Sequence, residues 1–355
     1  MLDCTIHRFG GKPGRLTFLD LDRPQTAHKS LCGVRQSFGE QFRRMLFRQF
    51  PGWEIETLSC SIDLQRSFSP VFPRARISRG TAQIAAMACP TIQDEPAFLT
   101  FALLWFDHVR AHSRTGMRTS MCLFLSEDAG NLTAHRLRWL IEESFGPRVF
   151  RFNTHGSAGE VDPQDLGNLE TRVKAGRHDS EQMQDIALPS DVRPPATSER
   201  MLESIIRSNV AMIDATLLPS PIHGQVLTFA GGDRDLIDLL AVSCEGRLAV
   251  LELKITEDLH LPMQALDYWM RIRWHAERNE LPHLFPGIPL ANTLPKLLLV
   301  APAMSFHSSN ALVLRYFSPE IEVERVGVNS DWDQRLKVVL RLSAADMPIC
   351  HRSSE

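Results

Sequence analysis

The chain has 355 residues, of which 43% are hydrophobic and 23% charged, and its formal net charge is -3 at pH 7. This composition is typical of globular proteins and excludes disordered and fibrous classes. The most apolar run, residues 98–106, is shorter than the roughly 18 residues that cross a bilayer, so we expect no membrane anchor. The first residues lack the basic end and apolar core of a secretory signal, which favours a cytoplasmic protein.

The seven cysteines are scattered along the chain, and no two of them are spaced as Cys-x-x-Cys. This pattern argues against a disulfide framework and against a cysteine zinc site. Charge is distributed unevenly, because residues 1–154 carry a net positive charge and residues 155–355 a net negative one. The first stretch is therefore the one whose field would attract a polyanion.

Residues 155–197 predict a linker between two domains. The stretch is rich in glycine and proline and poor in large apolar side chains, so it cannot bury enough surface to form a core. The sequence therefore predicts one domain over residues 1–154 and a second over residues 198–355.

The first predicted element is an amphipathic helix, because Phe38, Phe42, Leu46 and Phe50 recur at intervals of four. Further elements of the first domain follow the same reasoning: strands at 53–62, 74–77 and 82–88, a helix at 97–109, a strand at 121–125, a helix at 133–143 and a strand at 148–152. The pattern predicts a mixed α/β domain, and no catalytic motif identifies its role.

The second domain begins with a helix at Ser198, a good N-cap residue. Its other predicted elements are strands at 226–229, 236–242 and 247–253, a helix at 262–278, a strand at 296–301, a helix at 309–317 and strands at 321–326 and 336–342. Both domains thus share the order α, β, β, β, α, β. This repetition suggests that the first domain is a degenerate copy of the second.

The predicted hairpin of the second domain contains charged residues within apolar runs. Asp238 lies in the first run, and Glu252 and Lys254 lie in the second. Because strand side chains alternate, Glu252 and Lys254 project from the same face. Burying a carboxylate costs several kcal/mol unless it is paired or bound to a metal, so these residues predict a functional site.

Gln264 and Tyr268 follow on the next predicted helix, four residues apart and hence on one face. The ordered set of Asp238, Glu252-x-Lys254 and Gln264-x-x-x-Tyr268 resembles the PD-(D/E)xK nuclease superfamily, in particular its RecB-like and NucS-like branches. The resemblance covers only part of the second domain, residues 198–301. It implies a restriction-endonuclease-like αβββαβ core.

The resemblance also implies roles for the residues. Asp238 and Glu252, together with the carbonyl of Leu253, would bind Mg²⁺ or Mn²⁺, since hard cations prefer oxygen ligands. Lys254 would orient or activate the attacking water and stabilise charge on the phosphate.

The family has further site residues on two helices. Gln264 and Tyr268 would position Lys254 and the nucleic-acid backbone. A helix carboxylate would complete the site, and Glu199 matches its position better than Glu203.

Structural alternatives exist for several of these residues. Asp238 is also suited to capping the hairpin, Glu252 and Lys254 to a structural ion pair, and Glu199 to the dipole of its helix. Glu257 and Asp258 predict a solvated loop.

The sequence therefore predicts a divalent-metal-dependent nuclease that acts on DNA rather than RNA. The resemblance adds a homodimer as an expectation, because many relatives pair to cut two strands. The alternative is a nuclease-fold binding or regulatory module whose activity is absent or is gated by a ligand or partner of the first domain. If the segment 74–80 (RARISRG) of the first domain is exposed, its three arginines offer phosphate contacts.

Overall fold

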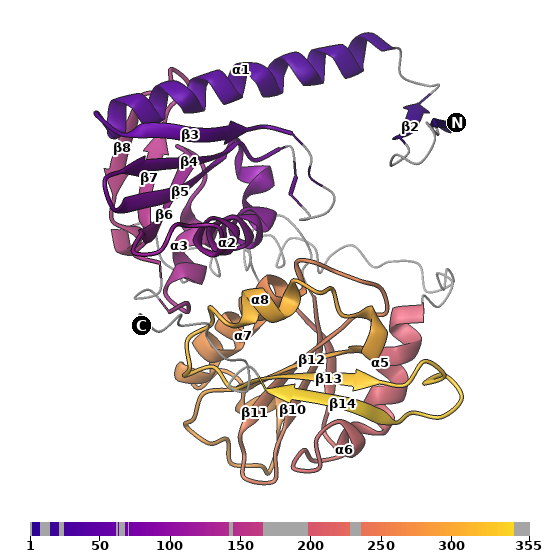
Figure 1. Cartoon of the computed structure of the whole chain (residues 1–355). Helices are drawn as coiled ribbons and strands as arrows, with labels where there is room; N and C mark the ends of the chain where they lie inside the picture. Colours follow the sequence, from indigo (N-terminus) through magenta and orange to yellow (C-terminus); the bar gives the residue numbers. More distant parts are fainter. Residues whose placement is uncertain are drawn as a thin grey trace, which may run out of the picture.

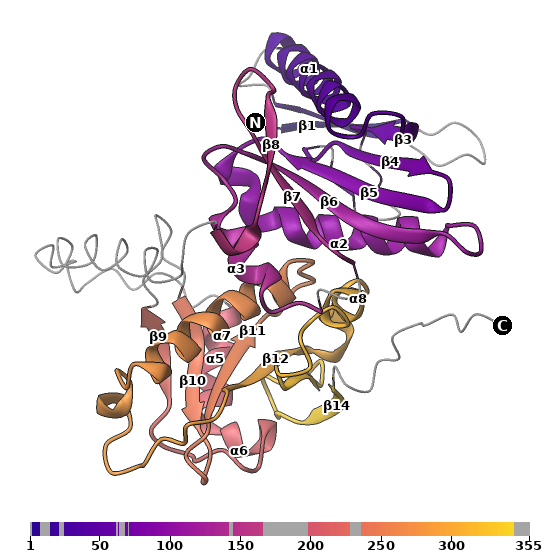
Figure 2. The same cartoon turned by 90° about the vertical axis from the view of Figure 1, so that its left-hand side faces the viewer.

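The structure is a computed structural model that describes residues 2–7, 15–20, 25–61, 63, 68–69, 71–141, 145–165, 198–227 and 236–343 (Figures 1 and 2). Only the backbone is described for residues 2–7, 15–20, 25–36, 198, 225–227 and 236–237. Within these ranges, no helix combines the length and the apolar character needed to cross a membrane.

The first half of the chain contains two sheets. A two-stranded hairpin, which the sequence pattern did not predict, pairs β1 (Leu2–His7) with β2 (Arg15–Asp20). The larger sheet and its helices are α1 (Gln25–Gln49), β3 (Glu54–Ser59), β4 (Arg74–Arg79), β5 (Ala82–Cys89), η1 (Ile92–Asp94), α2 (Glu95–Ala111), β6 (Arg118–Ser126), α3 (Asn131–Leu137), β7 (Arg148–Phe152), β8 (Ala158–Val161) and η3 (Pro163–Asp165).

The second half contains one described sheet with its helices. Its elements are α5 (Ser198–Ser208), α6 (Val210–Ile213), β9 (His223–Leu227), β10 (Leu236–Val242), β11 (Leu248–Leu253), α7 (Leu261–Glu277), η4 (Pro282–Leu284), β12 (Lys296–Pro302), η5 (Ala303–Ser305), α8 (Asn310–Leu314), β13 (Val323–Val328) and β14 (Val338–Ser343). The predicted fold class, mixed α/β, is correct for both halves.

The described residues form two six-stranded mixed sheets of the same topology. The orders are β3-β4-β5-β6-β7-β8 and β9-β10-β11-β12-β13-β14. In each sheet the first three strands are antiparallel, the next two continue parallel, and the last is antiparallel again. The repeated order predicted from the sequence is therefore present, and it extends over whole sheets.

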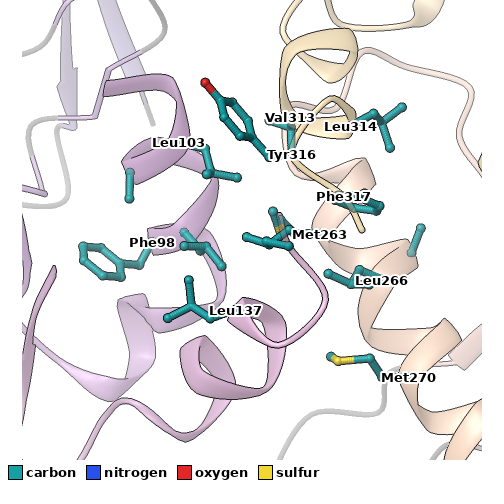
Figure 3. Close-up of a cluster of buried hydrophobic side chains, with 14 of the residues drawn as sticks. Phe98, Leu103, Leu137, Met263, Leu266, Met270, Val313, Leu314, Tyr316 and Phe317 are labelled. Carbon is teal, nitrogen blue, oxygen red and sulfur yellow. The ribbon is translucent and has the colours of Figure 1, made fainter. Parts of the chain in front are cut away.

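Helices α2, α3, α7 and α8 lie between the two sheets, and α1 and α5 lie on the outer sides (Figures 1 and 2). The outer faces pack separately: Phe42 and Leu46 of α1 cover the first sheet, and Leu202 and Ile206 of α5 cover the second. The inner helices share one apolar cluster that runs through both halves (Figure 3). The two halves are thus joined by a common core, which removes apolar surface of both from water.

The linker predicted at residues 155–197 begins too early. Residues 158–161 form β8, which pairs with β7 and completes the first sheet. This strand has only four residues and lies at the sheet edge, so its sequence lacks the apolar run of a central strand. The remainder of the predicted linker, 166–197, lies outside the described residues.

The arginines of the segment 74–80 are not a free phosphate-binding surface. Arg74, the first residue of β4, is buried and donates a hydrogen bond to the carbonyl of Ser61 (2.9 Å), and Arg76 pairs with Glu56 (2.6 Å). Arg79 alone of the three is exposed. The expectation of three phosphate contacts is therefore wrong.

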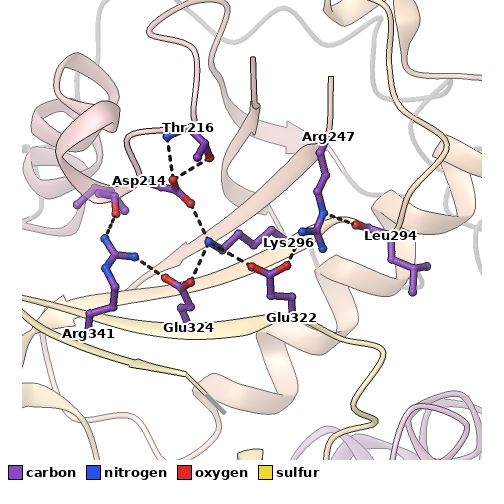
Figure 4. Close-up of polar contacts among 9 residues, drawn as sticks. Asp214, Thr216, Arg247, Leu294, Lys296, Glu322, Glu324 and Arg341 are labelled. Carbon is purple, nitrogen blue, oxygen red and sulfur yellow. Dashed lines mark hydrogen bonds and ion pairs between the residues drawn. The ribbon is translucent and has the colours of Figure 1, made fainter. Parts of the chain in front are cut away.

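A polar network ties the end of α6 and the loop after it to the beginnings of β12 and β13 in the second sheet (Figure 4). The ammonium of Lys296 lies 2.8 Å from Asp214, 2.9 Å from Glu324 and 3.4 Å from Glu322. Asp214 also accepts hydrogen bonds from the amide and hydroxyl of Thr216. Each carboxylate is thus paired, as groups withdrawn from water need to be.

Candidate functional site

The hairpin β10–β11 places Asp238 and Glu252 next to each other. Paired residues in this hairpin run from Val242–Leu248 to Leu239–Leu251, and the two carboxylates come directly after the last pair. There the amide of Leu253 donates its hydrogen bond to Oδ2 of Asp238 at 2.8 Å. Asp238 therefore satisfies a backbone donor at the end of the ladder, and this bond fixes its orientation.

Lys254 extends from the end of β11 beside the carboxylates. Its ammonium lies 3.7 Å from Oε1 of Glu252, and its own amide donates to the carbonyl of Val300 on β12 at 3.0 Å. The side chain of Glu252 is 3% exposed, whereas that of Lys254 is 21% exposed. The carboxylate is thus enclosed by the fold, and the lysine side chain beside it is partly exposed.

Burial dominates the electrostatics of the two carboxylates. It raises the pKa of Asp238 to about 6 against the opposing effect of the Leu253 hydrogen bond. Burial also raises the pKa of Glu252 well above its usual range, and the negative charge of Asp238 adds to this shift. Two carboxylates this close cannot both ionise easily without a cation.

The pKa of Lys254 shifts upward. Its own burial lowers the pKa, but the surrounding carboxylates, Glu252 first and then Glu199 and Asp238, raise it more. Lys254 is therefore held as an ammonium ion by its neighbours.

Helix α5 brings Glu199 and Glu203 into the electrostatic range of the site. Glu199 acts on Asp238, Glu252 and Lys254 alike. Glu203 raises the pKa of Asp238 but is itself paired with Arg207 at 2.5 Å. Of the two, Glu199 is the carboxylate that acts electrostatically on all three residues, and its role as the helix carboxylate stays a prediction.

The pair Glu203–Arg207 depends on a glycine in the neighbouring strand. A Cβ on Gly224 of β9 would lie 1.4 Å from Nη2 of Arg207 and 2.4 Å from Oε1 of Glu203. The missing side chain leaves room for the ends of these two side chains on β9, the strand that pairs with β10. Gly224 thus accommodates the Glu203–Arg207 pair.

Asp258 belongs to the site, although the sequence predicted a solvated loop there. Its carboxylate accepts the backbone hydrogen of His260 at 2.7 Å and acts electrostatically on Glu252 and Lys254. Its neighbour Glu257 is exposed, as predicted. The only feature of the sequence that could have indicated this is the position of Asp258, in the loop between the hairpin and the first turn of α7.

Gln264 and Tyr268 lie on α7 and face the other half of the chain. They line a pocket of about 200 Å³ together with Pro96, Ala97, Arg136, His260 and Asp267. The carbonyl oxygen of the Gln264 side chain is buried and has no hydrogen-bond partner among the described residues. Their predicted role in positioning Lys254 stays a prediction.

Arg136 of α3 forms the wall of this pocket from the first half. Its guanidinium makes two hydrogen bonds of 2.9 Å to the carboxylate of Asp267 and one of 2.6 Å to the carbonyl of Pro96. This bidentate pair fixes the turn of α7 that carries Gln264 and Tyr268 against the first half.

The donor set of the hairpin fits a hard divalent cation. Oε2 of Glu252 is buried without a hydrogen-bond partner among the described residues, an arrangement that a bound cation would satisfy. Asp238 supplies the second carboxylate. In the described ranges no group of three or more His, Cys, Asp or Glu residues is arranged to hold a metal. Mg²⁺ is often held by one or two carboxylates together with waters and substrate phosphates, so a carboxylate pair is compatible with such an ion.

Comparison of the chain with protein-family models, with curated proteins and with solved structures gives no match. The chemistry of the site is therefore assigned from the arrangement of Asp238, Glu252 and Lys254.

Proposed function

We propose that the chain is a divalent-metal-dependent nuclease of the PD-(D/E)xK type that hydrolyses phosphodiester bonds, in DNA rather than RNA. The observation that carries this proposal is the juxtaposition of Asp238, Glu252 and Lys254 at the open end of one hairpin. Burying the Glu252 carboxylate with one oxygen lacking a hydrogen bond is unfavourable for stability, which favours a functional role for it.

The order of elements around the hairpin supports the same proposal. Helix α5, the antiparallel strands β9 to β11, helix α7 and the parallel strand β12 have the order and direction expected of a restriction-endonuclease-like αβββαβ core. Asp238 and Glu252 lie on its second and third strands, where the family carries its metal ligands.

In the proposed mechanism Asp238 and Glu252 would hold Mg²⁺ or Mn²⁺, with the carbonyl of Leu253 as the predicted third ligand. The ion would lower the pKa of a bound water and neutralise charge that develops on the phosphate. The ammonium of Lys254 donates a hydrogen bond that orients the attacking water and stabilises the same charge. Burial of Glu252 excludes bulk water from this side of the reaction centre.

Cleavage of labelled DNA and RNA tests the proposal. Single-stranded, double-stranded and branched DNA and RNA are incubated with Mg²⁺ or Mn²⁺, and the products are resolved on gels. Glu252→Gln and Lys254→Met should each lower cleavage by 100-fold or more, since transition-state charge stabilisation is worth roughly 10²–10³ in rate. Glu257→Gln, at an exposed position in the loop that follows β11, is the matched control and should cut normally.

Failure to cut any substrate would contradict the proposal. If the same protein binds Mn²⁺ and loses that binding in Glu252→Gln, the alternative of a gated or binding module is favoured. If it binds no metal at all, the metal site itself is wrong.

A further inference from the structure

The two halves of the chain are related by an approximate twofold axis. At the axis the amide of Ile141 donates to the carbonyl of Tyr316, and the amide of Ser318 donates to the carbonyl of Trp139, both at 2.8 Å. The two segments follow α3 and α8, which are equivalent helices of the repeated topology. Each bond is thus the counterpart of the other, as in an interface between identical subunits.

Side-chain contacts between the two halves match in the same way. Trp139 lies against Trp269, with ring centroids 4.7 Å apart, and under Arg273, both of which belong to α7. Its counterpart Tyr316 lies 5.9 Å from Phe106 and under Arg110 of α2. In both cases an aromatic residue packs on an aromatic residue and an arginine of the opposite long helix.

The strands of the two halves can be placed in register by their hydrogen bonds. The amide of Met121 in β6 donates to the carbonyl of Phe145, shortly before β7 (2.8 Å). The amide of Leu297 in β12 donates in the same way to the carbonyl of Glu322, just before β13 (2.9 Å). Met121 and Leu297 are therefore equivalent, and both side chains face the shared core.

The pairing of neighbouring strands extends the equivalence of Met121 and Leu297 to the residues of the candidate site. Met121 pairs with Ala85, and Leu297 pairs with Val250. Counting from these positions along the paired strands gives the counterparts of Asp238, Glu252 and Lys254, which are Arg74, Met87 and Cys89.

The three counterparts cannot hold a divalent cation. Met87 and Cys89 are buried, and the thiol of Cys89 donates to the carbonyl of Thr91. Arg74 lies 4.7 Å from the ring centre of Phe68, where its charge would repel a metal ion. The position of the carboxylate pair in the first half is thus occupied by an arginine and two apolar groups.

We propose that the chain is a covalent pseudo-dimer with one hydrolytic site that acts as a monomer and cuts one strand of a duplex at each binding event. This inference rests on the proposed function. A symmetric dimer would bring two carboxylate pairs to the two strands of DNA, whereas this arrangement brings one. The apolar faces of the inner helices, which would pair two protomers, are already buried against each other within the chain (Figure 3). The proposal therefore replaces the homodimer expected from the resemblance.

The mass of the full chain tests the pseudo-dimer independently of activity. Light scattering after size-exclusion chromatography should give 40.1 kDa with and without Mg²⁺, and one chain for each bound duplex oligonucleotide. A stable species of twice that mass would overturn the proposal even if the protein is an active nuclease.

Cleavage of supercoiled plasmid with Mg²⁺ tests the number of cuts. Open-circular DNA should accumulate before linear DNA, and mixing wild type with Glu252→Gln should lower the rate in proportion to the wild-type fraction. Mixing with Glu257→Gln should leave the rate unchanged.

Direct formation of linear DNA, or a rate that follows the square of the wild-type fraction, would overturn single-strand cutting but would not contradict the proposed nuclease activity. Cleavage of no substrate would overturn the proposed function and this inference with it.

Discussion

Asp238 has two opposing effects in the folded chain. Its carboxylate orients the end of β11 by accepting the Leu253 amide, yet its burial raises its pKa to about 6 from the ordinary 3.8. An acid whose pKa is raised in the folded state favours folding only while protonated. Ionised Asp238 therefore destabilises the metal-free protein near pH 7, which is consistent with a residue retained for function rather than stability.

Replacement of Asp238 by Asn should stabilise the metal-free protein. Asparagine keeps an acceptor for the Leu253 amide but carries no charge to bury, so we expect a gain of about 1–3 kcal/mol in the free energy of unfolding at pH 7. The gain should shrink towards zero at pH 4, where Asp238 is protonated in the folded state. Urea unfolding in EDTA at both pH values measures this, with exposed Glu257→Gln as the control. A less stable variant at pH 7 would contradict the prediction.

Metal affinity should depend steeply on pH. A carboxylate must lose its proton to bind a cation, and both Asp238 and Glu252 have raised pKa values. Below pH 6 we expect the Mn²⁺ affinity to rise about tenfold per pH unit for each proton displaced. Calorimetric titration between pH 5 and 8 measures the slope. An affinity that does not change over this range would show that the ion binds elsewhere.

The charged residues of the site were predictable because they interrupt apolar runs. Asp238, Glu252 and Lys254 stand out in the sequence, and the structure brings them together at the end of one hairpin. Asp258 was not predictable, because a polar residue in a polar loop has no distinguishing pattern. Its place beside Glu252 and Lys254 depends on how the loop before α7 folds back.

At the scale of elements, most strands of the two large sheets were predicted, including the edge strands β3 and β14. The predicted ranges 148–152 and 236–242 coincide with β7 and β10, because apolar residues recur within both. The hairpin β1–β2 and the edge strand β8 were missed. β8 has only four residues and no apolar run, so its sequence gives little sign of pairing.

The pairing of Arg136 on α3 with Asp267 on α7 was also invisible in the sequence. The two residues are far apart along the chain, yet Arg136 is 1% exposed and Asp267 8%. Replacing Arg136 by Met should lower the free energy of unfolding by about 3–5 kcal/mol, because the Asp267 carboxylate is left buried without a partner.

A double variant provides the control for this prediction. Arg136→Met combined with Asp267→Leu removes both charges and should recover most of the loss. Urea unfolding of the three proteins measures the difference. If Arg136→Met alone has no effect, the pair does not hold α7 in place.

At the scale of the whole molecule, a shared core joins the two halves, so we expect them to unfold as one cooperative unit. The cluster between the sheets contains residues of both halves, and the bridge between Leu140 and Phe317 crosses their boundary. Two domains could be predicted from the composition of the linker. Their common core could not, because an apolar helix face does not show which surface covers it.

Phe317→Ala should destabilise both halves together. The side chain is 4% exposed, and loss of a buried phenylalanine ring costs about 3–5 kcal/mol. We expect a single calorimetric transition at lower temperature, with hydrogen exchange accelerated in β6 and β12 alike. The control Met304→Ala removes a side chain that is 91% exposed and should change stability by less than about 0.5 kcal/mol. Separate transitions for the two halves would contradict the prediction.

The bridge at Leu140 and Phe317 also bears on how the sequence can vary. In a homodimer every substitution appears twice, so a change that improves one copy of a surface alters the other as well. Joining the halves in one chain removes this restriction, and residues at equivalent positions can diverge. Trp139 and Tyr316 still keep their matching places at the axis, while Asp238 and Arg74 have opposite charges at equivalent positions. The chain therefore keeps matching residues at this bridge and departs from symmetry where the chemistry differs.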